Sequence, residues 1–210
     1  MRPQRSLLLA LVLIAASAAV GVWAWRMLPA AGFAPGWPGL AVLPVVGFVV
    51  VVLLALAPRW LGGGEALARS GGAFGILLIG VAAMFLVAEA AIAMRGLDPT
   101  FDAIRWLFVA VGILFVLVGA VLGRIAPNPI VGIRTPWALA DESVWRRTHH
   151  FTGRLLALGG VALAAVASLS PDRTDLVVVL VICILGPLLA GVVYSRAIAG
   201  PKDGGPKEAG

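Results

Sequence analysis

The stretch "NPIVGIRTPWALADESVWRRTHHFTGR", residues 128–154, is a polar interruption in an apolar chain. It carries four arginines, two tryptophans and both histidines of the protein, whereas the sequence on either side is mainly Leu, Val, Ala and Gly. Charged side chains are costly inside a bilayer and are rare in membrane spans. The stretch therefore predicts a loop between membrane-spanning helices, and the rest of the chain is interpreted around it.

The composition predicts an integral membrane protein. Of the 210 residues, 61% are hydrophobic and 12% charged, and the mean hydropathy is +1.04. A soluble domain of this length would carry about 25% charged residues. The net charge of +6 is typical of a membrane protein with arginines on its cytoplasmic side, and does not require nucleic acid as a partner. The single cysteine, Cys183, excludes an intrachain disulfide.

Six apolar segments are candidates for membrane-spanning helices, which need about 20 residues each. The first could instead be a signal peptide ending near "ASA" (residues 16–18), but its apolar stretch exceeds the usual signal core, which favours an uncleaved helix. The fifth is short unless residues 151–154 extend it. The expected spans are 6–25, 39–57, 71–94, 106–123, 155–169 and 176–194.

The basic residues predict the orientation. With the N-terminus inside, twelve of the sixteen Lys and Arg residues fall on the cytoplasmic side, in agreement with the positive-inside rule. Both termini and the loop at residues 124–154, here called the signature loop, are then cytoplasmic. The four left outside are Arg26, Arg95, Arg105 and Arg173.

Small residues at a spacing of four predict close helix packing in the third and fourth spans. The pairs are Gly71 with Gly75 and Gly119 with Gly123. Such spacing lets helix backbones approach closely in a membrane. It carries no information about dimers.

The first half of the signature loop is expected to be rich in turns and without regular helix. "APNPIVGIRTPW" has three prolines and a glycine. Pro136 favours an extended conformation at Thr135. Gly132 gives freedom where the chain bends or approaches another group.

The second half predicts an amphipathic helix at the membrane surface that leads into the fifth span. Asp141 is a good N-cap, with Glu142 in the first turn. Trp145 and His149 are expected at the border between the two faces. The apolar face is Val144, Thr148, Phe151 and Leu155, and the polar row is Arg146, His150 and Arg154.

Charge and amphipathicity alone are also explained by a loop that only fixes topology, because any basic loop would serve that purpose. That reading leaves the constrained "GIRTPW" unexplained. The order and spacing of "PN…GIRTPW.L…VW..TH" resemble the signature of the SdpI family over about two dozen positions. Family members commonly have Thr at the position of Ala138. The matching residues are Pro127, Asn128, Gly132, Ile133, Arg134, Thr135, Pro136, Trp137, Leu139, Val144, Trp145, Thr148 and His149.

The resemblance implies a bacterial multi-pass protein of the cytoplasmic membrane, named for immunity to a secreted sporulation-delaying peptide toxin. It extends over residues 105–194 and is weak before them. The expected organisation is an N-terminal three-helix region (1–104) that is a degenerate form of the family's N-terminal module, an SdpI-like three-helix domain (105–196) and a disordered cytoplasmic tail (197–210). The degenerate module has "LPAAGFAPGWPG", residues 28–39, which lacks the family's histidine.

Glu89 is the one carboxylate well inside an expected span. An unpaired charge in lipid costs at least about 2.5 kcal/mol, so Glu89 should face other helices, pair or be protonated. One interpretation is a site for a cationic or proton-coupled ligand, with Arg26, Arg95 or Arg105 as partners. The other is that this end of the helix emerges into the headgroups.

No catalytic, cofactor or metal motif is present in the sequence. The adjacent His149 and His150 point to different sides of a helix and have no suitably spaced Cys or acidic partner, which argues against zinc. A P-loop, a dinucleotide-binding fingerprint and a Gly-x-Ser-x-Gly motif are all missing. We expect a protein that is not an enzyme and has no cofactor.

Three functions are compared. The first is an immunity protein that contacts the bilayer and a peptide toxin. Its loop would also bind a cytoplasmic regulator through Arg134, Trp137 and Trp145. In the family that the chain resembles, such a regulator is a small repressor held at the membrane. The second is a small transporter or lipid-handling protein that uses Glu89 and the arginine-rich loop. The third is an enzyme acting on a phosphorylated lipid, with His149 as acid or base.

Overall fold

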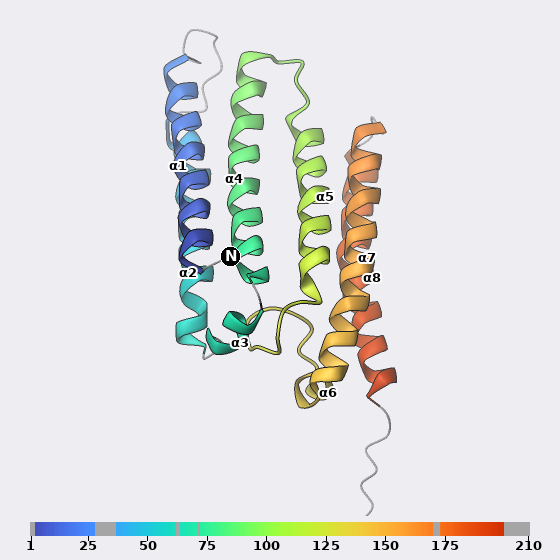
Figure 1. The fold of residues 1–210 in the computed structure, drawn as a ribbon. Coiled ribbons are helices and arrows are strands. Elements are labelled where there is room, and N and C mark those ends of the chain that lie inside the picture. Colours follow the sequence, from blue (N-terminus) through green and yellow to red (C-terminus); the bar gives the residue numbers. More distant parts are fainter. Residues whose placement is uncertain (1–2, 28–36, 62–63, 71, 170–172, 200–210) are drawn as a thin grey trace, which may run out of the picture.

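The protein is a bundle of six long helices with two short helices at one end (Figure 1). The computed structural model describes residues 3–27, 37–61, 64–70, 72–169 and 173–199. The described part contains helices and no strand. The helices are α1 (Pro3–Met27), α2 (Trp37–Trp60), α3 (Gly64–Arg69), α4 (Ala73–Leu97), α5 (Ala103–Leu122), α6 (Pro136–Ala140), α7 (Glu142–Leu169) and α8 (Arg173–Ile198).

All six expected spans are helices long and apolar enough to cross a membrane. Their outer surfaces carry many exposed large apolar side chains, such as Leu8, Phe48, Leu158 and Leu189, as expected for contact with lipid tails. The prediction of an all-helical, multi-pass membrane protein is confirmed. The proposed tail lies almost entirely outside the described residues, as does most of the degenerate module segment at 28–39.

The long helices pack in two groups of three. Helices α1, α2 and α4 contact one another, α7 packs between α5 and α8, and contacts between α4 and α5 join the groups (Figure 1). The short helices α3 and α6 lie at the same end of the bundle, together with the signature loop.

The tightest packing is between α5 and α7, at two pairs of glycines. A Cβ atom on Gly112 would stand 2.6 Å from the carbonyl oxygen of Gly160. A Cβ atom on Gly153 would stand 2.5 Å from the carbonyl oxygen of Gly119. Both distances are too short for any side chain, so glycine is required where the two backbones touch.

The predicted glycine pairs are only partly used as expected. Gly119 packs against α7, but Gly123 lies against the ring of His150, and Gly75 lies against the side chain of Ser6 in α1. Gly71 lies outside the described residues. The four-residue spacing identified Gly119 as a contact residue of α5 but missed Gly112. The partners of these two glycines in α7, Gly153 and Gly160, are seven residues apart.

The signature loop is more helical than expected. Thr135 is extended (φ −72°, ψ 149°), as predicted, and its hydroxyl accepts a hydrogen bond from Ala138 N. Pro136 then begins α6, so the expectation that this half has no regular helix is wrong. Proline suits the first position of a helix, where its missing N–H would be unpaired anyway.

The amphipathic segment is the beginning of α7 and not a separate element, because Glu142 to Leu169 form one continuous helix. Its polar row, Arg146, His150 and Arg154, is exposed as predicted. The fifth span therefore includes the residues that the sequence placed at the membrane surface.

We expect Gly153→Leu to destabilise the protein by about 1–3 kcal/mol or more, because the new side chain has to displace the backbone of α5. The measurement is the thermal unfolding midpoint of the purified protein in detergent. Gly186→Leu is the matched control, since a Cβ at Gly186 meets no atom within 4 Å. Equal midpoints for both variants would contradict the proposed role of the glycine contact.

The predicted orientation can be tested by adding one cysteine at either of two exposed positions, Pro99→Cys between α4 and α5 or Ala140→Cys at the end of α6. A membrane-impermeant thiol reagent applied to intact cells should label residue 99 and not residue 140. The parent protein gives the background, because its Cys183 is buried. Labelling of residue 140 and not of residue 99 would show that the protein has the opposite orientation.

Candidate functional site

The signature loop starts with a turn organised by one buried side chain, Asn128. Its Oδ1 accepts hydrogen bonds of 2.8 Å from the N–H groups of Ile130 and Val131. Its Nδ2 donates to the carbonyls of Ala126 (2.8 Å) and Val131 (3.3 Å). An amide both donates and accepts, which a carboxylate cannot do, and this explains asparagine at the position.

His149 anchors the next part of the loop to α7. Its Nε2 accepts a 2.9 Å hydrogen bond from the N–H of Ile133, and its Nδ1 is 2.8 Å from the carbonyl oxygen of Trp145. Because Nε2 accepts, the proton of the neutral ring is on Nδ1, which donates to that carbonyl. Gly132 has a φ of +117° and lies directly against His149 Nε2, leaving no room for a Cβ.

Trp145 stacks on His149, with ring centroids 4.0 Å apart and planes at 21°. Its indole N–H donates a 2.7 Å hydrogen bond to the carbonyl of Ile125. Both rings are buried, which their predicted position at the border of the helix faces did not indicate. The loop itself folds over this side of α7 and covers them, which no periodicity within the helix can reveal.

The end of the loop is fastened to α8. The indole N–H of Trp137 donates a 2.8 Å hydrogen bond to Ser195 Oγ, and Thr135 Oγ1 lies 3.3 Å from the same oxygen. The guanidinium of Arg196 lies over the Trp137 ring, 5.4 Å from its centroid. Ser195 was missed by sequence reasoning, since a lone serine directly after an apolar span carries no signal of this role.

Asp141 caps α7, as predicted. Its Oδ1 accepts from the N–H groups of Ser143 (2.7 Å) and Val144 (3.3 Å). Hydrogen bonds from the Ser143 side chain and from these two backbone groups lower the pKa of the Asp141 carboxyl below its ordinary value. The carboxylate therefore keeps its negative charge at the positive end of the helix dipole.

Two buried threonines of α7 lack hydrogen-bond partners for their hydroxyls within the described part of the chain, Thr148 and Thr152. Thr148 is part of the signature, but its buried hydroxyl has no hydrogen bond to any described residue. Thr152 lines an apolar cavity of about 360 Å³ between α5, α7 and α8, together with Ile133 of the loop. The cavity therefore lies between the loop and the group formed by α5, α7 and α8.

Arg134 is the exposed charged residue among the signature positions. Its guanidinium donates to the carbonyl of Pro129, within the same loop. Leu139 and Arg147 are also exposed nearby in the sequence. Of the three side chains predicted to bind a partner, Arg134 is available, Trp137 is half-buried and Trp145 is enclosed.

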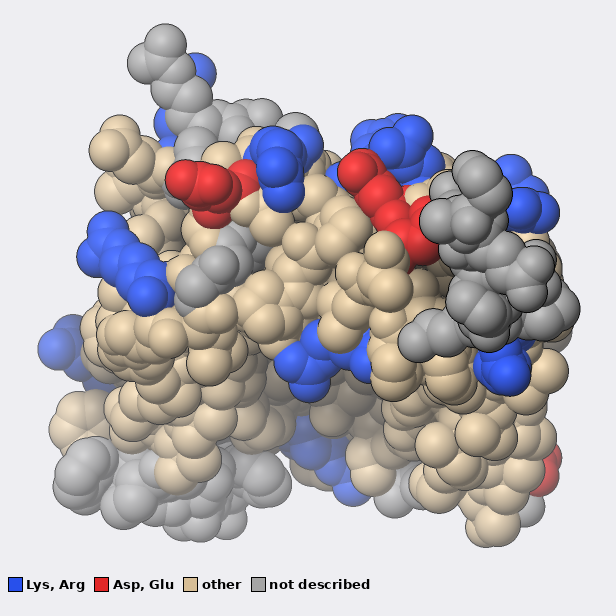
Figure 2. All heavy atoms as spheres, turned by 90° about the horizontal axis from the view of Figure 1, so that it is seen from below, with Lys and Arg blue, Asp and Glu red and all other residues tan. Residues whose placement is uncertain are grey.

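A polar cavity of about 320 Å³ lies beside the loop. Its lining includes Pro127 and three arginines from three different elements, Arg69, Arg124 and Arg146. Basic side chains are spread over this end of the molecule, with acidic ones between them (Figure 2). One such pair joins Arg146 to Glu142 at 3.1 Å.

Ser70, also missed in the sequence, connects the loop to the first helix group. Its hydroxyl accepts a 3.0 Å hydrogen bond from the N–H of Ala126 and donates to the carbonyl of Ala66. The apolar residues Ala73 of α4 and Ile125 of the loop belong to one buried cluster. The loop is therefore held from both sides of the bundle.

Glu89 lies apart from the loop, in α4. It is fully buried in the protein, so the interpretation that it emerges among headgroups is wrong. The expected arginine partners are not used: Arg95 donates to the carbonyl of Phe101, Arg105 lies 3.9 Å from Asp102, and neither Glu89 oxygen has a hydrogen-bond partner among the described residues. In the same part of the chain, no group of three or more His, Cys, Asp or Glu residues could hold a metal ion.

The geometry accounts for much of the resemblance noted in the sequence, because His149, Trp145 and Trp137 fasten the loop to α7 and α8. Residues 124–195 match the model of the SdpI/YfhL protein family. This matching stretch, here called the family segment, is less than half of the chain. No solved structure matches the chain.

The family segment extends from the signature loop to the last turns of α8. A similar curated protein is "Immunity protein SdpI" of Bacillus subtilis (strain 168), which is 28% identical over 102 residues. The match covers 49% of this chain and 46% of the relative, so the two correspond over about half of their lengths. The similarity to the SdpI/YfhL family, together with six apolar helices in the described chain, places the protein in the cell membrane as a multi-pass protein.

We expect His149→Ala to loosen the loop, because the buried N–H of Ile133 loses its acceptor, at a cost of about 1–3 kcal/mol. The measurement is the rate of trypsin cleavage after Arg134 in detergent-solubilised protein. His150→Ala is the control, since the neighbouring ring is exposed. Similar cleavage rates for the two variants would show that His149 does not hold the loop.

Proposed function

We propose that this protein is a membrane immunity protein that protects the cell against a membrane-active peptide toxin. The observation that carries the proposal is the similarity to an immunity protein over the segment that contains the signature loop. The loop's internal hydrogen bonds support a role as a fixed structural element. In this proposal the protein protects by binding or excluding the peptide and catalyses no reaction.

The loop also has a surface that a cytoplasmic regulator can bind. Arg134 presents a planar, permanently charged donor group, and Leu139, five residues later in the sequence, is 48% exposed. The buried anchors behind this surface, among them Asn128 and His149, hold its backbone in one conformation. A fixed backbone lowers the entropy lost on binding. Signalling through this surface is part of the proposal.

We expect Arg134→Ala to lower survival under toxin challenge toward that of cells without the protein, at an unchanged membrane level. The substitution removes an exposed charge and leaves the buried anchors in place. The measurement is the surviving fraction of bacteria exposed to a secreted sporulation-delaying peptide toxin. The amount of each variant in the membrane is quantified by immunoblot. Arg59→Ala, which removes an exposed arginine at the end of α2, is the matched control.

If protection and protein level fall in parallel, Arg134 supports folding only. If abundant wild-type protein gives no protection, the immunity proposal fails and a role in transport or lipid handling gains support. Survival of the Arg134→Ala strain at the wild-type level would remove Arg134 from the mechanism while leaving immunity intact.

A further inference from the structure

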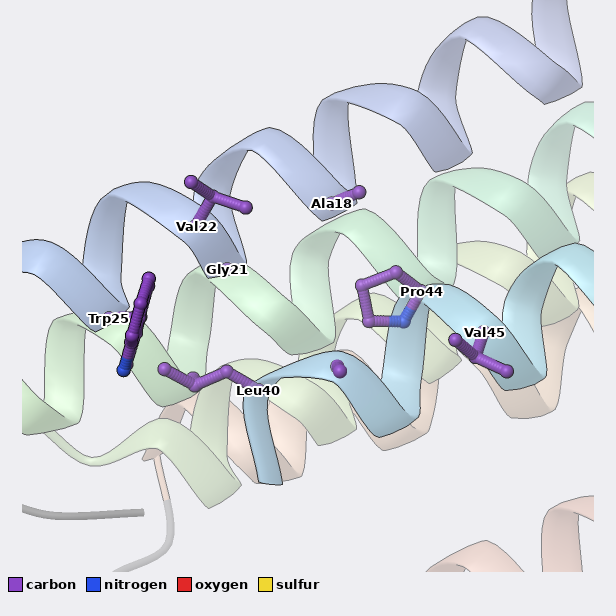
Figure 3. A pocket seen from close by; sticks show the side chains of 8 residues that line it. Ala18, Gly21, Val22, Trp25, Leu40, Pro44 and Val45 are labelled. Atoms are coloured by element: carbon purple, nitrogen blue, oxygen red, sulfur yellow. The ribbon is translucent and has the colours of Figure 1, made fainter. Parts of the chain in front are cut away.

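A cavity of about 440 Å³ lies between α1 and α2, with α4 behind it (Figure 3). Its walls are apolar, and Ala18, Val22 and Trp25 of α1 face Pro44 and Val45 of α2 across it. Ala18, Val22, Trp25 and Val45 are exposed on the outer surface of the bundle, where lipid tails would lie. The cavity is thus reached from the hydrocarbon and suits an apolar chain.

A carboxylate lies directly behind this cavity. A Cβ on Gly21, a lining residue, would stand 2.8 Å from Glu89 Oε1. Gly21 therefore puts no side chain between α1 and the carboxylate. Glu89 is fully buried, and both its oxygens lack hydrogen-bond partners in the described chain.

Pro44 leaves a backbone carbonyl without its helical hydrogen bond, and this second acceptor lies near Glu89. Proline has no N–H, so it cannot donate to the carbonyl of Leu40, four residues earlier in α2. That carbonyl oxygen lies 3.0 Å from the same Cβ position on Gly21. The hydroxyl of Ser17, one turn before Gly21 on the same side of α1, is also buried without a partner among the described residues.

These groups have the chemistry of a receptor for an organic cation. A buried carboxylate in a membrane calls for a positive partner, and none of the described arginines supplies one. A backbone carbonyl offers a further acceptor to an ammonium N–H, and the indole of Trp25 at the cavity wall can attract a cation through its ring face. The apolar walls would hold the chain attached to that cation.

We propose that the α1–α2 cavity is a binding site for a hydrophobic ammonium compound, which enters from the bilayer and places its charged group against Glu89 and the Leu40 carbonyl. The site is separate from the signature loop and lies outside the SdpI-family segment. It does not depend on the immunity function, and its test uses purified protein without any toxin.

The test compares two probes of equal chain length, dodecylammonium and uncharged dodecanol. Bound probe is measured by partition between empty nanodiscs of zwitterionic lipid and the same nanodiscs carrying the protein. We expect the wild-type protein to bind the ammonium about tenfold more tightly than the alcohol, because only the cation pairs with the carboxylate. Equal binding of both probes would overturn the proposal.

Two variants assign the preference to the site. Glu89→Gln keeps the size of the side chain and should abolish the preference for the ammonium, whereas Glu65→Gln, the same change at an exposed residue of α3, should retain it. A preference that survives in Glu89→Gln would refute the role of the carboxylate. Ala18→Phe fills the cavity from its exposed side and should weaken binding of both probes; unchanged binding would refute entry through this cavity.

Discussion

The close contact between the backbones of α5 and α7 is the constraint on which the functional part of the structure depends. Two glycine pairs bring these helices together, and lipid offers no hydrophobic force that could do so. The signature loop connects the same two helices, so their separation sets the distance that it must cover. With α7 at this position, His149 and Trp145 face the loop and can take its backbone groups as partners.

Much of the fold could be predicted because its physical causes are local. A span is recognisable from about 20 apolar residues, and the cap at Asp141 and the extended Thr135 follow from the chemistry of one or two residues. Burial of His149 and the role of Ser195 could not be predicted. Each depends on a segment that arrives from elsewhere in the chain, and a helical pattern gives the faces of a helix without saying what covers them.

The two helix groups have different relationships to known proteins. The family segment includes the loop, α7 and most of α8, whereas α1, α2, α4 and α5 lie outside it. They are nevertheless joined to it, through the Ser70 hydroxyl at Ala126 and the apolar cluster around Ile125. The group formed by α1, α2 and α4 therefore helps to hold the loop in place. Its buried carboxylate, Glu89, lies outside the family segment.

The unbroken course of α7 has a mechanical consequence. Its 28 residues give a rod of about 42 Å at 1.5 Å per residue, longer than the roughly 30 Å of the hydrocarbon layer. One end of this rod carries the anchors of the loop, and the other reaches the opposite face of the membrane. A stiff rod that pivots within the bilayer moves its two ends in opposite directions. Because the helix has no break, such a pivot would carry a displacement at one face of the membrane to the loop at the other.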